Sequence, residues 1–172
     1  MEVDLTRTKM NGSKLILGID PGYGITGYGI IRVEGAKMFC LECGVIQTSA
    51  KEEFSIRIKI LHIELKKIIK KFKPNLVSIE SLFFCNNAKT AIKVGQARGI
   101  ILLTAILENV PIVEYTPLQV KQAISGYGNA DKSQVQQMVK LILGLKTIPR
   151  PDDAADALAI AISAANHFNL KL

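Results

Sequence analysis

The hydrophobic and polar positions divide the chain into short strand-like runs and longer helix-like ones. Residues 15–20 form a short apolar run that ends in Asp20 and then breaks at a Pro-Gly pair, which is typical of a buried strand followed by a turn. Residues 25–33 and 37–48 read as two more strands. Because the connections between these three strands are too short for a crossover, they are predicted to form an antiparallel meander.

The later part of the chain alternates predicted helices and strands. The predicted helices cover residues 52–73, residues 88–107, a segment containing Val120 and Lys121, a segment from Asp131 through Leu143, and residues 152–167; the predicted strands cover residues 76–80 and 111–115. The strand at 76–80 follows a helix, so it should lie parallel to the first strand through a right-handed crossover. The sequence therefore predicts an α/β fold with a mixed five-stranded sheet, flanked by helices on both faces.

A glycine pattern follows the first strand. Gly22, Gly24 and Gly27 match the spacing of the dinucleotide-binding fingerprint. The fingerprint must open a helix, and here it opens a strand, with no acidic residue ending a second parallel strand about 20 residues on. We therefore reject a dinucleotide site and expect the glycines to give room to nearby backbone or to a ligand such as a DNA backbone.

Length and charge narrow the picture further. The 172 residues fit a polar, disordered tail at 1–13 and a single domain at 14–172. No apolar run reaches the roughly 18 residues of a membrane span, so a cytoplasmic protein without a membrane partner is expected. The net charge of +7 favours nucleic acid as partner. The basic face of the 52–73 helix is either a DNA-binding ridge or, as we favour, a solvated face.

The three cysteines do not indicate a disulfide framework. Cys40 and Cys43 lie in a predicted strand, where residues three apart point to opposite faces, and only Cys85 remains. Strand packing is therefore favoured over a metal or redox role.

Carboxylates provide the candidate chemistry. Asp20 and Glu80 end two parallel strands and should emerge at the same edge of the sheet, where open α/β sheets build their sites. On the last helix, either Asp152 or Asp153 can share a face with Asp156. Acids in the first turn of a helix can simply complement the helix dipole. This explanation suits Asp152 best. It suits Asp156 poorly, because the helix continues after Asp156 as an apolar run.

A cluster of four carboxylates needs cations to remain ionised. Oxygen ligands without His or Cys suit Mg²⁺, or Mn²⁺ in its place. In two-metal sites the ions, about 3.5–4 Å apart, clamp both the attacking and the leaving oxygen of a phosphate displacement. The basic composition and the acidic site therefore indicate the same substrate, a nucleic acid phosphodiester.

The 88–107 helix is apolar nearly all round. The sheet can cover only one flank of it, so the other flank calls for a partner. Ala91, Gly95 and Gly99 would permit close helix packing, and a homodimer through this helix is predicted.

Six motifs between about Lys14 and Asn166 closely resemble the RuvC family of bacterial Holliday junction resolvases, within the RNase H-like superfamily of metal-dependent nucleases. They are Gly18-Ile19-Asp20-Pro21-Gly22, Ile79-Glu80, Gly95-Gln96-Ala97-Arg98-Gly99, Val120-Lys121-Gln122, Lys132-Ser133-Gln134-Val135 and Asp153-Ala154-Ala155-Asp156-Ala157-Leu158. The resemblance implies an RNase H-like fold and a dimer that resolves four-way DNA junctions in recombination and repair. Paired symmetric nicks would leave 5′-phosphate and 3′-hydroxyl ends, and a branch-migration motor would be a further partner.

The same resemblance assigns residue roles. It makes Asp20, Glu80, Asp153 and Asp156 the catalytic acids and ligands of two Mg²⁺ ions, choosing Asp153 over Asp152. It places Lys121 and Lys132 near the DNA backbone and Phe83 on bases near the junction centre.

Three other functions remain open. Another RNase H-like nuclease would have equal charge and carboxylates. An actin-like or sugar-kinase ATPase shares the glycine-rich turn after Asp20 but normally needs two lobes and a longer chain. A basic DNA-binding module without catalysis would leave the carboxylates without a role.

Overall fold

The structure, a computed structural model, describes residues 13–81 and 88–169. Its elements follow the predicted order: β1 Ser13–Asp20, β2 Ile25–Glu34, β3 Lys37–Gln47, α1 Phe54–Phe72, β4 Leu76–Glu80, α2 Ala88–Leu107, β5 Ile112–Tyr115, α3 Pro117–Ser125, α4 Lys132–Ile142 and α5 Asp152–Asn169. The predicted tail lies outside the described residues except for Ser13, which begins β1. None of the helices described is both long and apolar enough to cross a membrane.

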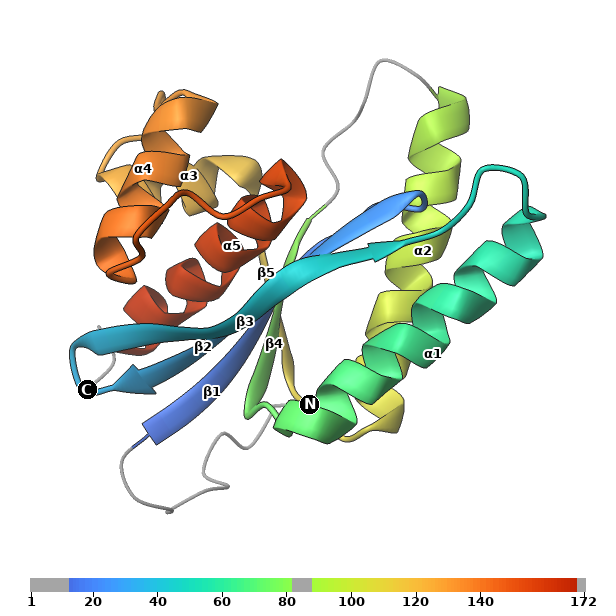
Figure 1. Cartoon of the computed structure of the whole chain (residues 1–172), viewed down its shortest axis with the longest axis horizontal. Coiled ribbons are helices and arrows are strands. Elements are labelled where there is room, and N and C mark those ends of the chain that lie inside the picture. The colour runs from blue at the N-terminus through green and yellow to red at the C-terminus, as the bar shows by residue number, and fades with distance from the viewer. Residues whose placement is uncertain (1–12, 82–87, 170–172) are drawn as a thin grey trace.

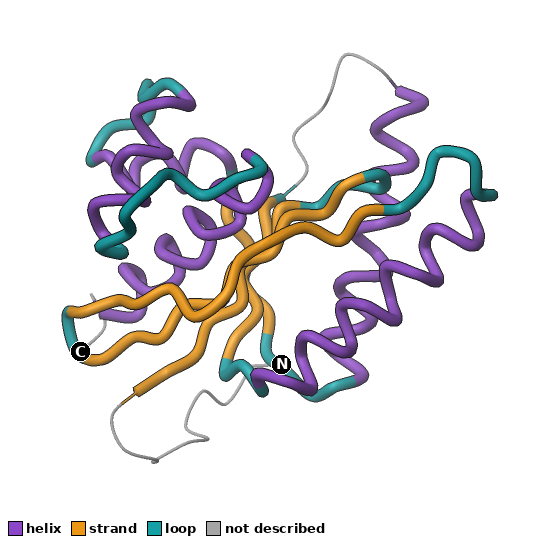
Figure 2. Tube along the Cα trace, viewed as in Figure 1, coloured by secondary structure: helices purple, strands orange, loops and turns teal. Residues whose placement is uncertain are grey.

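The five strands form one mixed sheet in the order β3-β2-β1-β4-β5. β1, β2 and β3 pair antiparallel, whereas β4 pairs parallel with both β1 and β5. Helices α1 and α2 cover one face of the sheet and α3, α4 and α5 cover the other (Figures 1 and 2). The predicted meander, crossover and two-sided helix layers are confirmed.

Strand alternation decides which helix layer Asp20 faces. In β1, Leu17 and Ile19 are buried with the core beneath α1 and α2, and Ile16 is buried with the core beneath α5. Because side chains alternate along a strand, Gly18 and Asp20 share the face of Ile16. Asp20 therefore ends β1 on the α5 side.

β4 repeats this arrangement beside β1. Ile19 of β1 lies opposite Ile79 of β4 in the parallel register, so both strands deliver their terminal carboxylates at the same edge. Ser78 is fully buried and donates a hydrogen bond to the backbone oxygen of Ile160 on α5, at 3.0 Å. Glu80, two residues further on, lies on that same face.

Two glycines allow α5 to lie directly on the sheet. A Cβ atom on Gly18 would lie 2.0 Å from the backbone oxygen of Ala157, and one on Gly27 would lie 2.0 Å from that of Asp153. Of the two expectations for the glycine pattern, room for nearby backbone holds at Gly27, which accommodates the start of α5, and room for DNA does not. A Cβ atom on Gly22 would likewise meet the carbonyl of Ile25.

The two cysteines of β3 correct another prediction. The pairing of β2 with β3 shifts between Ile30 and Ile31, which leaves Leu41 as an extra residue in a β-bulge. The bulge changes the alternation, and Cys40 and Cys43 both pack against the core beneath α5. Their predicted placement on opposite faces is wrong, although their role in packing holds.

The basic face of α1 is largely neutralised within the chain. Lysines of this face pair with glutamates at Lys66–Glu108, Lys67–Glu64 and Lys71–Glu42. These pairs favour the solvated face over a DNA-binding ridge. Arg57, a further basic residue of this helix, is buried.

Candidate active site

A cavity of about 230 Å³ opens at the edge of the sheet where β1 and β4 end. Among the residues that line it are five of the predicted site residues: Asp20, Glu80, Lys121, Lys132 and Asp156. These side chains come from five different elements, β1, β4, α3, α4 and α5. Folding therefore brings together groups that are as far as 136 positions apart in the sequence, counted from 20 to 156.

Two predicted site residues remain to be placed. Asp153 does not line this cavity, but its charge acts on both Asp20 and Asp156. Asp153 lies in the first turn of α5, one turn before Asp156, and its backbone packs against Gly27 of β2. Phe83 lies outside the described residues, so its predicted stacking on bases stays a prediction.

Asp20 is the most strongly perturbed carboxyl group of the site. Burial, together with the charges of Glu80, Asp156 and Asp153, raises its pKa from 3.8 to about 7. Lys132 opposes this shift. A carboxylate with a raised pKa gains from any cation that approaches it, so Asp20 is poised to bind one.

The neighbouring carboxyl groups are perturbed in the same direction. Burial, and then the charge of Asp156, raises the pKa of Glu80. Burial also raises the pKa of Asp156, although its hydrogen bond and ion pair with Lys132 work against the shift. All three acids therefore carry unfavourable negative charge in the absence of a cation.

Lys132 is the internal cation closest to this cluster. Its Nζ lies 3.1 Å from Oδ2 of Asp156 and 3.5 Å from Oδ2 of Asp152. A capping box fixes the helix start that carries it: Asp131 Oδ1 accepts from the Gln134 backbone N–H at 2.8 Å, and Gln134 Oε1 accepts from the Asp131 backbone N–H at 3.0 Å. The ammonium is thus held at the cavity by the first turn of α4.

Lys121 enters the cavity from a second capped helix. Thr116 and Gln119 form the capping box of α3, with Pro117 in its first turn. Nothing in the local pattern around Lys121 or Lys132 indicates a site, because both are ordinary positions of short amphipathic helices. Only the family resemblance identified them.

Asp152 lies in the first turn of α5, as predicted. Its carboxylate also pairs with Arg150 and Lys132. Although desolvation raises the pKa of Asp152, the nearby side-chain amide of Gln136 and the charges of Lys132 and Arg150 bring it below its usual value. Asp152 is therefore already neutralised by the chain, unlike Asp20.

The donor set suits a hard divalent cation. Oxygen is the only donor type among the four acids, and three of them have raised pKa values. Across residues 13–81 and 88–169, however, no three His, Cys, Asp or Glu side chains are gathered tightly enough to form a ready metal-binding group. The acids fit such an ion in chemistry and charge, and to ligate one ion together they would have to approach one another.

This electrostatic strain predicts a pH effect on stability without metal. The pKa of Asp20 is higher in the folded chain than its ordinary value, so the contribution of this group to stability is fully present below about pH 4 and is lost as the pH rises through about 7. In EDTA at pH 8, Asp20→Asn should therefore raise the free energy of unfolding by about 2 kcal/mol. Denaturant unfolding measures this, with pH 4 as internal control, where the two proteins should differ little. Equal stabilities at pH 8 would contradict the strain.

Comparison with known proteins identifies the family of this chain. The family model described as crossover junction endodeoxyribonuclease RuvC matches residues 16–164. A relative of that name from Ruminiclostridium cellulolyticum is 55% identical over 156 residues, covering 91% of this chain and 94% of the relative. Another from Natranaerobius thermophilus is 50% identical over 157 residues, covering 91% and 98%.

Solved structures give the same result. The structure of T. thermophilus RuvC in complex with Holliday junction substrate is 40% identical, with a TM-score of 0.88, and the match covers 92% of this chain and 96% of that one. The yeast mitochondrial Holliday junction resolvase Ydc2, at 20% identity and a TM-score of 0.68, shares the fold. With the family model spanning most of the chain and relatives more than half identical, this chain belongs to the RuvC family of crossover junction endodeoxyribonucleases.

Proposed function

We propose that this chain is a structure-selective endonuclease that resolves four-way DNA junctions in recombination and repair. It would make paired symmetric nicks and leave 5′-phosphate and 3′-hydroxyl ends. The observation that carries the proposal is the cavity where Asp20, Glu80 and Asp156 meet Lys121 and Lys132. Metal-dependent hydrolysis of a phosphodiester requires acids that bind the metal ions and cations that bind the phosphate backbone, and this cavity contains both.

Asp20, Glu80, Asp153 and Asp156 would hold Mg²⁺, with two ions per site and Mn²⁺ able to replace them. When bound, the ions supply an activated water and stabilise the leaving oxygen. The protein contributes a partly buried pocket in which charge interactions are stronger than in water. Lys121 and Lys132 attract and orient the DNA backbone, and Phe83 is proposed to stack on bases near the junction centre.

A substrate panel tests this function. Four-way junction, flap, RNA–DNA hybrid and linear duplex substrates are incubated with the protein and Mg²⁺. We expect symmetric nicks in the junction only, and none in EDTA. Equal cutting of all substrates would favour a different RNase H-like nuclease, and nicking of none would favour a DNA-binding module without catalysis.

The neighbouring acids Asp152 and Asp153 offer a matched test of the site. We expect Asp153→Asn to lower junction cleavage by about 100-fold or more, equivalent to about 2.7 kcal/mol of transition-state stabilisation. Asp152→Asn should change it only a few-fold, because Arg150 and Lys132 already neutralise that carboxylate. Single-turnover cleavage rates measure both. The reverse order would assign the metal to Asp152.

We also propose that the protein is a homodimer through α2. Ala97, Ile101 and Ala105 on one side of this helix are fully buried in the core. The other side exposes large apolar residues: Ile92, Leu103, Ile106 and Leu107, exposed by 64%, 49%, 62% and 58%. A second copy would cover this stripe and place two cavities on one junction, as paired nicks require.

Charge placed in this stripe should dissociate the dimer. We expect Ile92→Glu and Ile106→Glu to halve the molar mass measured by light scattering, because the introduced carboxylates would be buried unpaired at the interface. Leu141→Glu on α4 is the matched control, since Leu141 is 68% exposed but lies away from α2. A wild-type chain that is monomeric at micromolar concentration would refute the interface.

A branch-migration motor complex remains a proposed partner, and the cytoplasm of a bacterium remains the proposed location. Both rest on family membership alone.

A further inference from the structure

Arg57 of α1 is a buried cation with no anionic partner in the part of the chain that the structure describes. The residue is 9% exposed, and it forms no ion pair with any Asp or Glu that the structure describes. Its Nε donates to Oγ1 of Thr48 at 3.0 Å and its Nη2 donates to the backbone oxygen of Tyr23 at 3.2 Å. Both acceptors are neutral, so the hydrogen bonds leave the charge uncompensated, which is costly in a buried site.

These hydrogen bonds fasten the turn that follows Asp20. Oγ1 of Thr48 also donates to the backbone oxygen of Tyr23, at 3.0 Å, and the Thr48 backbone N–H donates to the backbone oxygen of Gly24, at 2.9 Å. Arg57 and Thr48 thus bind the backbone carbonyl groups of Tyr23 and Gly24. Tyr23 is three residues from Asp20, and three residues span at most about 10 Å. The turn therefore begins within about 10 Å of Asp20, and Tyr23 packs on the α1 side of the sheet, whereas the cavity lies on the α5 side.

A second cation approaches the same aromatic ring. Cζ of Arg57 lies 4.9 Å and Nζ of Lys93 lies 5.5 Å from the centroid of the Tyr23 ring. Lys93 comes from α2, is exposed, and has no ion-pair partner among the described acids. The ring attracts both cations but carries no net charge. Two positive charges from different helices therefore meet at one place without a carboxylate.

We propose that Tyr23, Arg57 and Lys93 form an anion site for DNA. The site would bind a phosphodiester group of the same strand whose scissile phosphate lies in the cavity, at a neighbouring position along that strand. This inference rests on the proposed function. Lys93 would contact the phosphate as an exposed point charge, while Arg57 acts from behind the turn as a positioning residue and through its charge. A bound phosphate supplies the negative charge that this cluster lacks.

The phosphate is favoured over an acidic protein segment because of where the cluster lies. The turn that carries Tyr23 is continuous with Asp20. A DNA strand whose scissile phosphate occupied the cavity would extend beyond it on both sides, and we infer that one side passes this turn. Phosphates repeat along that strand every 3.4 Å of helix rise, so an adjacent cation site meets the next charges of the substrate.

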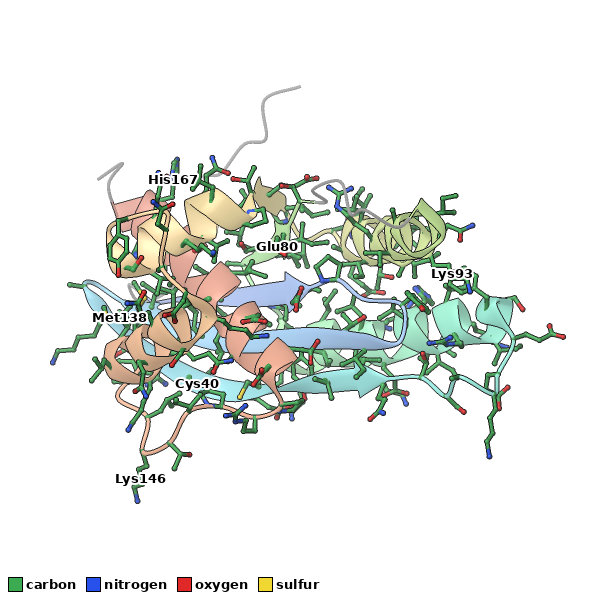
Figure 3. The ribbon with its side chains drawn as sticks, turned by 90° about the horizontal axis from the view of Figure 1, so that it is seen from above. Cys40, Glu80, Lys93, Met138, Lys146 and His167 are labelled. Atoms are coloured by element: carbon green, nitrogen blue, oxygen red, sulfur yellow. The ribbon has the colours of Figure 1, made fainter. Side chains whose placement is uncertain are left out.

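Lys93→Ala tests the site without risk to the fold. Binding of a four-way junction is measured in EDTA, so that no cleavage occurs, across a series of salt concentrations. We expect the slope of log K against log salt to fall in magnitude by about 0.9 for each chain bound. Lys146→Ala is the matched control, since Lys146 is also exposed and lies at the opposite end of the molecule from Lys93 (Figure 3). Its slope should equal that of the wild type.

Arg57→Gln provides a second measurement. We expect a smaller salt slope and a lower single-turnover cleavage rate, because the turn after Asp20 loses its fastening. If this variant unfolds, the Lys93→Ala result decides. Normal junction binding with an unchanged slope in Lys93→Ala would overturn the anion site while leaving the proposed function intact. A wild-type chain that binds no junction would overturn both.

Discussion

Asp20→Asn should abolish junction cleavage while leaving junction binding intact or stronger. Asp20 is the acid on which burial and three neighbouring carboxylates act together. Loss of its charge should remove about 4 kcal/mol or more of transition-state stabilisation, which corresponds to about 1,000-fold in rate. Binding should survive, because the substitution removes a negative charge that faces phosphate. Single-turnover cleavage and an equilibrium binding assay with the same junction measure the two effects.

Glu34→Gln is the control for this substitution. Glu34 ends β2 at the edge of the sheet opposite to Asp20, beside Ser13 of β1, and it pairs with Arg32 on the surface, at 2.8 Å. The same neutralisation of one acid there should leave cleavage unchanged. If Asp20→Asn cleaves within a few-fold of the wild type, Asp20 is not a metal ligand.

Gly27→Ala should damage both stability and catalysis. A Cβ atom on Gly27 would lie 2.0 Å from the backbone oxygen of Asp153, so the start of α5 has to move. Overpacking of this kind costs about 1–3 kcal/mol in the free energy of unfolding. A displacement of about 1 Å of Asp153 relative to Asp20 should also slow cleavage by about 100-fold.

Gly24→Ala separates this effect from a general intolerance of the glycine pattern. A Cβ atom on Gly24 would meet only the end of the Arg57 side chain, at 3.1 Å. Thermal unfolding should show a much larger loss for Gly27→Ala than for Gly24→Ala. Equal losses of stability in the two variants would mean that Gly27 is not required for the close packing of α5 on the sheet.

The sheet and the positions of two acids could be predicted from the sequence because they follow from short-range rules. The apolar runs ending in Asp20 and Glu80 define buried strands, and the intervening helix makes them parallel. Strand alternation then fixes the face to which both carboxylates point. Every bound of the predicted strands and helices lies within about two residues of the structure, a spread usual for element ends.

Other features depend on contacts between distant segments and could not be predicted locally. Spacing permits either Asp152 or Asp153 to join Asp156, and the pairing of Asp152 with Arg150 and Lys132, which spacing does not reveal, favours Asp153, as the family resemblance does. The burial of Arg57 on a helix with a basic outer face depends on the turn at Tyr23, 34 positions earlier.

Irregular backbone and close packing account for the wrong predictions. One extra residue in β3 reverses the alternation that placed Cys40 and Cys43 on opposite faces. The glycines after Asp20 gave no indication in the sequence of what would approach them, and at Gly27 the approaching group is the last helix of the same chain.

The most direct test of the metal site is a crystal structure of the protein with Mn²⁺, with anomalous diffraction used to locate the ions. The predicted result is anomalous density at the cavity, coordinated by Asp20 together with Glu80, Asp153 and Asp156, while Lys132 is displaced from Asp156. Density held by Asp152 instead of Asp153, or no ion at the cavity at millimolar Mn²⁺, would contradict the account.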